Sequence, residues 1–281
     1  MITRNTTLNC KGKILDLSEP VVVGILNMTP DSFYDGSLYN NLELALERAQ
    51  KMVEEGAKIL DIGGMSSRPG SLEISIQEEI DRTSSIIELI SKALPTTYIS
   101  IDTYRAAVVK EAYKAGAHIV NDISAGRFDP ELLNTVAELK MPYILMHMQS
   151  TPADMQKNPE YEDVVVEVLD FFSFTIDRLN KKGIYDIIID PGFGFGKTVE
   201  HNYKLLKNLE IFKMCGMPIL AGLSRKSLVS KVIGSKSKDS LEGTTAVNMI
   251  ALQNGANLLR VHDVKAAMDC IKIYQYMQSI N

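Results

Sequence analysis

The sequence has few cysteines, and they are scattered along the chain. Only Cys10, Cys215 and Cys270 occur in 281 residues. An odd number without the spacing of a zinc or redox motif argues against a disulfide framework and against a cysteine metal site. We therefore expect three reduced thiols in a cytoplasmic protein.

An excess of positive charge and a long apolar run are also missing. Lysine and arginine number 30 against 35 aspartates and glutamates, so the net charge is −5. This balance argues against binding to nucleic acid or to a membrane surface. No run of 18 uninterrupted apolar residues occurs, and residues 1–5 lack the apolar run of a signal peptide. We expect neither a membrane span nor a secretion signal.

What the sequence does contain is a regular alternation of short apolar runs with segments of helical period. The runs cover residues 21–27, 59–64, 98–102, 119–123, 143–148, 187–190, 219–223 and 258–262. Ser75 and Glu78 form a capping box before one of the intervening helices. Such alternation predicts a parallel sheet with right-handed crossovers. Eight units in this length fit a single (β/α)₈ TIM barrel of the α/β class, with an open doubly wound sheet as the alternative.

The expected barrel occupies residues 19–281, and residues 1–18 form an N-terminal extension with the pattern of a small hairpin. The longest irregular stretches are 28–41, 65–74 and 149–160, and each follows a strand. They should lie on the C-terminal face of the barrel, where long loops usually have a function.

Polar residues stand at the ends of successive apolar runs, and they fall into two chemical groups. Asp102, Asn121 and Asp190 are acceptors and amides that suit a planar ligand with two adjacent N–H donors. A cationic group suits an anion such as diphosphate; it consists of Arg68, Lys226, Arg260 and His262. The two groups together suggest a ligand that is part nitrogen heterocycle and part diphosphate.

Five blocks of sequence resemble the dihydropteroate synthase family. They are Gly24-Ile25-Leu26-Asn27-Met28-Thr29-Pro30-Asp31-Ser32-Phe33, Ser67-Arg68-Pro69-Gly70, Asp190-Pro191-Gly192-Phe193-Gly194-Phe195-Gly196-Lys197, Ser224-Arg225-Lys226 and Arg260-Val261-His262-Asp263. The resemblance runs in order from about residue 20 to 280. It implies a (β/α)₈ barrel and a transferase of folate biosynthesis. The implied reaction joins 6-hydroxymethyl-7,8-dihydropterin diphosphate to 4-aminobenzoate, through Mg²⁺-assisted departure of diphosphate and attack of the amine on a pterin methylene cation.

The resemblance also implies roles for single residues. The pterin would contact Asp102, Asn121, Met146, Asp190, Gly222 and Lys226. The diphosphate would contact Asn27, Arg68, Arg260 and His262, with Asn27 also a ligand of Mg²⁺. The aminobenzoate site would be lined by Phe33, Ser67, Pro69, Phe195 and Ser224. Catalysis would depend on Asp35, which stabilises the cation, and on Lys226, Arg260 and His262. A homodimer and sensitivity to sulfonamides are typical of the family.

The second long loop departs from the family pattern. The family usually has Gly-Gly-Glu-Ser-Thr-Arg-Pro-Gly, whereas this chain has Met65 in place of the glutamate and Ser67 in place of the threonine. Other residues keep two interpretations at this stage. Lys197 could approach the site or lie on the surface, His147 could touch substrate or not, and Asp61 could orient the pterin or Arg68 without contacting substrate.

Three other functions remain open. A methyltransferase that uses methyltetrahydrofolate would share the pterin contacts but would not need the diphosphate cations. An aldolase-like barrel would use Lys226 for a Schiff base. A non-catalytic pterin-binding relative is compatible with Met65 but leaves Arg68, Arg260 and His262 without a purpose.

Overall fold

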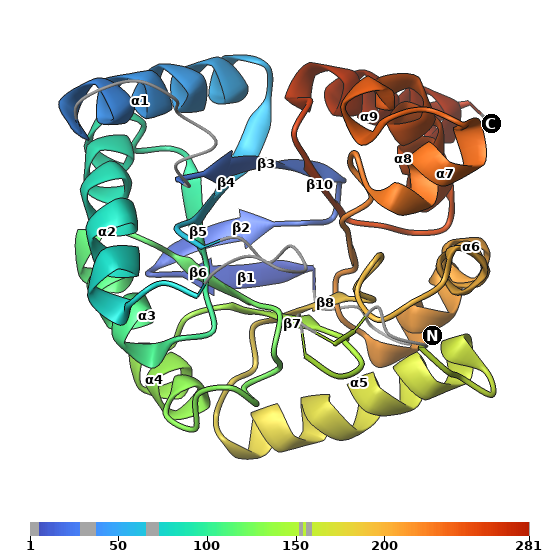
Figure 1. Cartoon of the computed structure of the whole chain (residues 1–281), viewed down its shortest axis with the longest axis horizontal. Helices are drawn as coiled ribbons and strands as arrows, with labels where there is room; N and C mark the ends of the chain where they lie inside the picture. The colour runs from blue at the N-terminus through green and yellow to red at the C-terminus, as the bar shows by residue number, and fades with distance from the viewer. Residues whose placement is uncertain (1–5, 29–37, 66–72, 152–153, 156–158, 281) are drawn as a thin grey trace.

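The chain folds into a parallel β-barrel enclosed by helices, as Figure 1 shows in a view along the barrel. The computed structural model describes residues 6–28, 38–65, 73–151, 154–155 and 159–280. The strands lie in the order β8-β7-β6-β5-β4-β3-β10-β9. A parallel bridge between Ile189 and Ile219 joins the two edges. The predicted barrel is therefore confirmed, and the open-sheet alternative is wrong.

The elements follow the predicted alternation. The barrel strands are β3 (Val21–Asn27), β4 (Ala57–Gly63), β5 (Tyr98–Asp102), β6 (Ile119–Asp122), β7 (Tyr143–Met146), β8 (Ile187–Asp190), β9 (Leu220–Ala221) and β10 (Leu258–Val261). The helices are α1 (Leu38–Glu54), α2 (Ile76–Ala93), α3 (Ala106–Ala115), α4 (Leu132–Leu139), α5 (Val164–Lys181), α6 (Val199–Lys207), η2 (Leu209–Cys215), α7 (Ser227–Ile233), η3 (Ser237–Asp239), α8 (Leu241–Gln253) and α9 (Val264–Ser279).

The inside of the barrel is built in layers because side chains alternate along each strand. Every barrel strand contributes one apolar residue to a common lower layer, which consists of Val23, Ile59, Tyr98, Ile119, Ile144, Ile188, Leu220 and Leu258. The residue two positions further along points inward again, one layer closer to the C-terminal ends. These second residues are Ile25, Asp61, Ser100, Asn121, Met146, Asp190, Gly222 and Arg260. The apolar lower layer, which we call the floor of the barrel, therefore lies directly beneath a mostly polar layer.

A hairpin closes the lower end of the barrel. Its strands β1 (Thr7–Cys10) and β2 (Lys13–Asp16) pair antiparallel, and Figure 1 shows them across the middle of the ring of helices. The hairpin and the residue that follows it pack Leu8, Cys10, Leu15 and Leu17 against the lower layer. This leaves the opposite, C-terminal end as the open mouth.

Local details differ from the sequence predictions at two helix starts. Ser75 caps α2 by accepting the Glu78 N–H, but Glu78 does not return the bond, because its carboxylate pairs with Arg82 at 2.6 Å. The reciprocal capping box instead joins Thr198 and His201 at the start of α6. Across the described part of the chain, no helix has the length and apolar character to cross a membrane.

Candidate active site

The predicted site residues gather at the open mouth, so far as the structure describes them. Phe33, Asp35, Ser67, Arg68 and Pro69 lie outside the described residues. The others come from the C-terminal ends of the strands or the loops directly after them; they are Asn27, Asp102, Asn121, Met146, Asp190, Phe195, Gly222, Ser224, Lys226, Arg260 and His262.

Arg260 connects the two chemical groups that the sequence kept apart. Its Nε donates to Asp61 Oδ2 at 2.6 Å and its Nη2 donates to Asp102 Oδ2 at 2.7 Å. Asn121 Nδ2 donates to the same Asp61 oxygen at 3.0 Å. Asp61, whose side chain is fully buried, therefore orients Arg260 and Asn121. The sequence had placed Asp61 behind the pterin or Arg68, and only the fold shows its partner.

The two carboxylates expected to bind the heterocycle are poorly solvated. Burial raises the pKa of Asp102 to about 7, although Arg260 opposes the shift. Burial also raises the pKa of Asp190, and Lys226 is the main opposing charge. A desolvated carboxylate is stabilised by any donor that approaches it. Both groups are therefore suited to a ligand that presents N–H groups.

Lys226 faces Asp190 across Gly222. A Cβ on Gly222 would lie 3.6 Å from Lys226 Nζ and 3.9 Å from Asp190 Oδ2, so a side chain there would fill the space between the two groups. Lys226 Nζ donates to the Phe193 carbonyl at 2.6 Å, and Asp190 Oδ1 accepts the Gly192 N–H at 2.7 Å. The loop after β8 thus orients both members of the pair.

A strained backbone before Lys226 is held by a second ion pair. Arg225 has φ 54°, a left-handed conformation that is costly for a residue with a side chain. Its guanidinium makes two bonds to Asp263, at 2.8 and 2.6 Å, and its N–H donates to Thr244 Oγ1 at 3.1 Å. Neither Arg225 nor Asp263 has a role predicted from the sequence. Their opposite charges within two of the family motifs were the available signal.

His262 is buried beside Ser224 and Arg260, and both the burial and the neighbouring cation favour its neutral form. Ser224 Oγ accepts the backbone N–H of His262 at 3.2 Å and lies 3.0 Å from its Nδ1. This favours donation of the hydroxyl proton to Nδ1, which leaves the ring proton on Nε2. Burial and the neighbouring Arg260 lower the pKa of His262 to about 4. The imidazolium expected from the sequence therefore requires a bound anion to form at neutral pH.

Lys197 is buried, so its interpretation as a surface lysine is wrong. Its Nζ lies 3.0 Å from His147 Nδ1 and donates to the carbonyls of His147, Gly192 and Phe195 at 3.3, 3.1 and 3.0 Å. Burial lowers the pKa of Lys197 to about 7 and that of His147 to about 2. The His147 ring is occupied by protein contacts: its Nδ1 bonds Lys197, and the ring packs edge-on against Phe171.

Apolar side chains form a wall beside the polar groups. Met146 packs in a small cluster with Ile123, Met148 and Met155, against which Phe195 is partly buried. Lys226 Nζ lies 4.8 Å from the centre of the Phe195 ring. A flat ligand held by Asp190 would therefore meet sulfur and aromatic surface next to the lysine.

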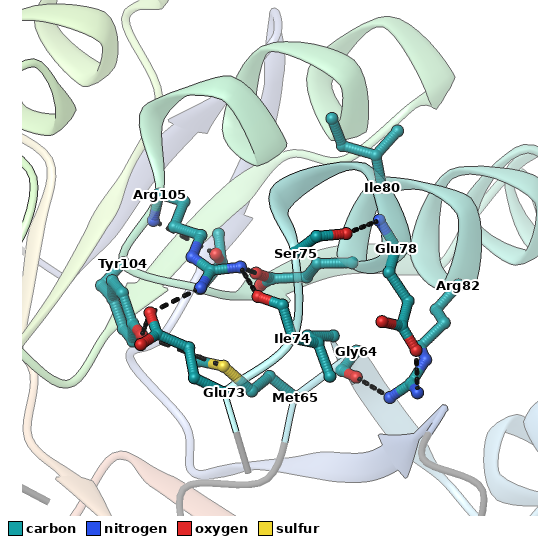
Figure 2. Close-up of polar contacts among 12 residues, drawn as sticks. Gly64, Met65, Glu73, Ile74, Ser75, Glu78, Ile80, Arg82, Tyr104 and Arg105 are labelled. Atoms are coloured by element: carbon teal, nitrogen blue, oxygen red, sulfur yellow. Dashed lines mark hydrogen bonds and ion pairs between the residues drawn. The ribbon is translucent and has the colours of Figure 1, made fainter.

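The described ends of the second long loop are tied to the loop after β5, as Figure 2 shows. Arg105 donates to Glu73 at 2.7 Å and to the buried Glu79 at 3.0 Å. The Tyr104 hydroxyl lies 3.3 Å from Glu73 Oε1 and 3.9 Å from Met65 Sδ. Met65, which replaces the usual glutamate of the family, thus contacts Tyr104, while Glu73 and Glu79 both supply carboxylates to Arg105.

Asn27 offers one hard oxygen ligand at the mouth. Its Oδ1 and Asp102 Oδ2 lie 3.7 and 3.8 Å from the position that a Cβ on Gly63 would take. Among the described residues, no cluster of three or more histidine, cysteine or acidic side chains could hold a metal ion. This donor set fits Mg²⁺ when most of the ligands are diphosphate oxygens and water, which is a common arrangement for that ion.

Comparison with known proteins shows the family of the chain. Residues 23–262 match the family described as "Pterin binding enzyme". The dihydropteroate synthase of Haemophilus influenzae is 45% identical over 270 residues, which are 95% of this chain and 98% of that protein. The structure of the Xanthomonas albilineans dihydropteroate synthase with 4-aminobenzoic acid has a TM-score of 0.91 at 40% identity and covers 98% of this chain and 99% of that one. The Yersinia pestis enzyme with a sulfonamide drug has a TM-score of 0.92 at 42% identity and covers 98% of this chain and 100% of that one. The chain belongs to the pterin-binding enzymes and, within them, to the dihydropteroate synthase family.

Proposed function

We propose that this chain catalyses the condensation of 6-hydroxymethyl-7,8-dihydropterin diphosphate with 4-aminobenzoate, which yields 7,8-dihydropteroate and diphosphate. The observation that carries the proposal is the buried carboxylate of Asp190, which faces Lys226 across Gly222. A second network, of Arg260 with Asp61 and Asp102, stands at the same mouth. The first arrangement suits a heterocycle with adjacent N–H groups, and the cations suit its diphosphate.

In this proposal the pterin lies in the upper layer of the barrel. Asp190 Oδ2 accepts the pterin N–H groups, and Asp102 and Asn121 contact the opposite edge of the ring. Lys226 donates to a ring acceptor from the space kept open by Gly222. Met146, which is 3% exposed, forms part of the apolar wall beside the ring.

Diphosphate departure is assisted by preorganised donors. Arg260 approaches with its guanidinium already oriented by two carboxylates, and His262 offers its Nε2 proton. Both spread the negative charge that develops as the bond between the methylene carbon and the bridging oxygen breaks. Binding of an anion also raises the pKa of His262 from about 4, which strengthens its bond to the leaving group.

The second substrate then forms the new bond. The amine of 4-aminobenzoate attacks the methylene carbon, and the resulting ammonium loses a proton to water. Phe195 and the Ser224 segment form the described part of its site, and Phe33, Ser67 and Pro69 are proposed to form the rest. Asp35 is proposed to stabilise the cation, and Arg68 to bind diphosphate with Arg260 and His262.

We propose Asn27 as the protein ligand of a Mg²⁺ ion that enters with the diphosphate. When bound, this ion would neutralise charge on the leaving group. The protein's own part is to present the Asn27 amide oxygen beside Asp102.

The other proposals concern assembly, location and inhibition. We propose a homodimer, because the neighbouring helices α7 and α8 expose Val232, Ile233, Leu241 and Ile250. The three free cysteines support a cytoplasmic location. Sulfonamides should compete with 4-aminobenzoate, as the sulfonamide complex of the Yersinia pestis enzyme suggests.

The structure weakens the Schiff-base alternative for Lys226. Its ammonium donates to the Phe193 carbonyl, and burial lowers its pKa only to about 8. Most of the side chain is therefore protonated at neutral pH and is a poor nucleophile. A methyltransferase or a non-catalytic binder would also have no diphosphate for the oriented Arg260 to bind.

The decisive experiment measures diphosphate and dihydropteroate after mixing the protein with the pterin diphosphate, with and without 4-aminobenzoate and Mg²⁺. We expect both products in equal amounts and a requirement for Mg²⁺. Lys226→Ala and Asp190→Asn should abolish both, whereas Lys204→Ala, at an exposed ion pair on α6, should not. Tight pterin binding without either product would contradict the proposal and favour the binding-only alternative.

A further inference from the structure

Lys197 ends the glycine-rich loop after β8 and has a buried ammonium that makes no exposed contact. The residue is only 3% exposed. Its Nζ lies within 3.3 Å of three backbone carbonyl oxygens and of His147 Nδ1. The protonated side chain has three protons, and the neutral amine that a pKa of about 7 also allows has two, so the four acceptors use every one of them. Lys197 therefore has no proton left with which to contact a substrate.

The acceptors belong to two different loops that pack backbone against backbone. His147 begins the loop after β7, while Gly192 and Phe195 belong to the loop after β8. A Cβ on Gly192 would lie 1.9 Å from the His147 carbonyl oxygen, so no side chain fits between the loops there. Carbonyl oxygens that converge in a buried place are stabilised by a shared donor. Lys197 supplies it and joins the two loops.

The same loop also contacts the groups that are proposed to bind the pterin. The Gly192 N–H donates to Asp190 at 2.7 Å, and the Phe193 carbonyl accepts from Lys226 at 2.6 Å. The Phe195 ring lies 4.8 Å from Lys226 Nζ. Every one of these contacts depends on where the backbone between residues 192 and 195 runs. Gly192, Gly194 and Gly196 adopt φ of 70, 81 and 60°. Because glycine has no Cβ to restrict its backbone, this segment has little stiffness of its own.

We propose that Lys197 is a positioning residue for the pterin site, because its ammonium fixes the loop that aims Lys226 and Asp190. The role is indirect: Lys197 bonds the backbone of the loop, whereas Asp190 and Lys226 are the groups proposed to contact the substrate. This inference rests on the proposed function for the identity of the ligand. It goes beyond it in giving a purpose to the last residue of the glycine-rich motif.

The test compares Lys197→Met, which keeps the length of the side chain without its donors, with Lys197→Gln, which keeps two donors. Lys204→Met on α6 is the matched control, because that lysine is exposed and its ammonium forms a surface ion pair with Glu200. For each protein, kcat and both KM values are measured, together with hydrogen exchange of the peptide that covers residues 191–198.

We expect Lys197→Met to raise the KM for the pterin diphosphate about tenfold. The kcat should stay within about threefold of the wild type, since the proposed diphosphate donors Arg260 and His262 lie at the end of β10 and not on this loop. The KM of Lys197→Gln should lie between those of Lys197→Met and the wild type, and the KM of Lys204→Met should equal that of the wild type. Amide exchange in 191–198 should become faster in the same order. If Lys197→Met does not fold, Lys197→Gln gives the same comparison.

Three outcomes would overturn the inference. Unchanged KM and unchanged exchange would show that the loop is held without Lys197. A higher KM with unchanged exchange would make Lys197 a direct ligand of substrate, and a loss of kcat alone would make it part of the chemistry. If the wild-type protein makes no dihydropteroate, the proposed function fails, but the exchange data and the affinity for 6-hydroxymethylpterin still decide the role of Lys197.

Discussion

Asp61 offers a sharp test of how the site is held together, because it contacts Arg260 and Asn121 rather than a substrate. Its side chain is fully buried, and its Oδ2 accepts bonds from both neighbours at 2.6 and 3.0 Å. Asp61→Asn removes one negative charge and changes almost no volume. Any effect should therefore come from charge and hydrogen bonding.

The expected loss follows from these contacts. A hydrogen bond to a charged group contributes about 1.5–3 kcal/mol, and a buried charge that loses a partner becomes costly. Arg260 keeps Asp102 at 2.7 Å, and its side chain is 20% exposed, so part of the loss is recovered. The new amide NH₂ would take the place of Asp61 Oδ1, which is buried without a hydrogen-bond partner in the described structure, so its N–H groups would lack an acceptor. We expect the free energy of unfolding to fall by about 2–3 kcal/mol.

Thermal unfolding measures this change directly. For a chain of this size, each kcal/mol corresponds to about 2 °C in Tm, so Asp61→Asn should unfold about 4–6 °C below the wild type. Asp269→Asn is the control, since it breaks an exposed pair with Lys265 and should shift Tm by less than about 1 °C. Steady-state kinetics give a second measurement. With Asp61 neutral, Arg260 should pair more closely with Asp102 and compete with the pterin for that carboxylate, which raises the KM for the pterin diphosphate.

Two results would refute this reasoning. If Asp61→Asn unfolded at the wild-type temperature, the buried pair would add nothing to stability. If its KM for the pterin diphosphate were unchanged while Tm fell, Asp61 would support the fold but would not control which groups Arg260 pairs with.

Three further predictions follow from the same contacts. Gly192→Ala should lower Tm by more than about 6 °C, because the new Cβ would overlap the carbonyl of a neighbouring loop; Gly183→Ala, with φ 85° but nothing within 4 Å, should cost only about 1–2 kcal/mol of backbone strain. Burial raises the pKa of Asp102 from 3.8 to about 7, so the folded state binds the proton more tightly than the unfolded state. The free energy of unfolding of the wild type should therefore fall relative to that of Asp102→Asn as pH rises from about 4 to 7. Chemical denaturation measures it, and the same dependence on pH in both proteins would contradict the prediction. Arg225→Met should release the strained turn before Lys226, because it removes both bonds to Asp263. We expect kcat/KM to fall about 10-fold or more, while the packing of the lower layer stays the same. Full activity would show that the turn keeps its conformation without the ion pair.

Much of the architecture could be read from the sequence because one rule repeats eight times. A barrel strand alternates inward and outward residues, so an apolar residue such as Ile188 in the lower layer puts Asp190 at the mouth. The same two-residue step leads from Ile59 to Asp61 and from Leu258 to Arg260. Strand ends and helix periods are local properties of the chain, and the eight alternating units were recovered for that reason.

The tertiary structure decided which charged groups pair. Arg260 and Asp61 are 199 residues apart, and nothing in the sequence distinguishes that partnership from one between Asp61 and Arg68. The burial of Lys197 was hidden for the same reason, since its acceptors are carbonyl oxygens that every residue possesses. Backbone strain at Arg225 likewise depends on how the chain turns in space. The sequence by itself determined where the polar groups emerge from the barrel, because alternation along a strand is fixed residue by residue. Only the closed barrel determined which of them meet, because electrostatic and hydrogen-bond partners are selected by distance in three dimensions.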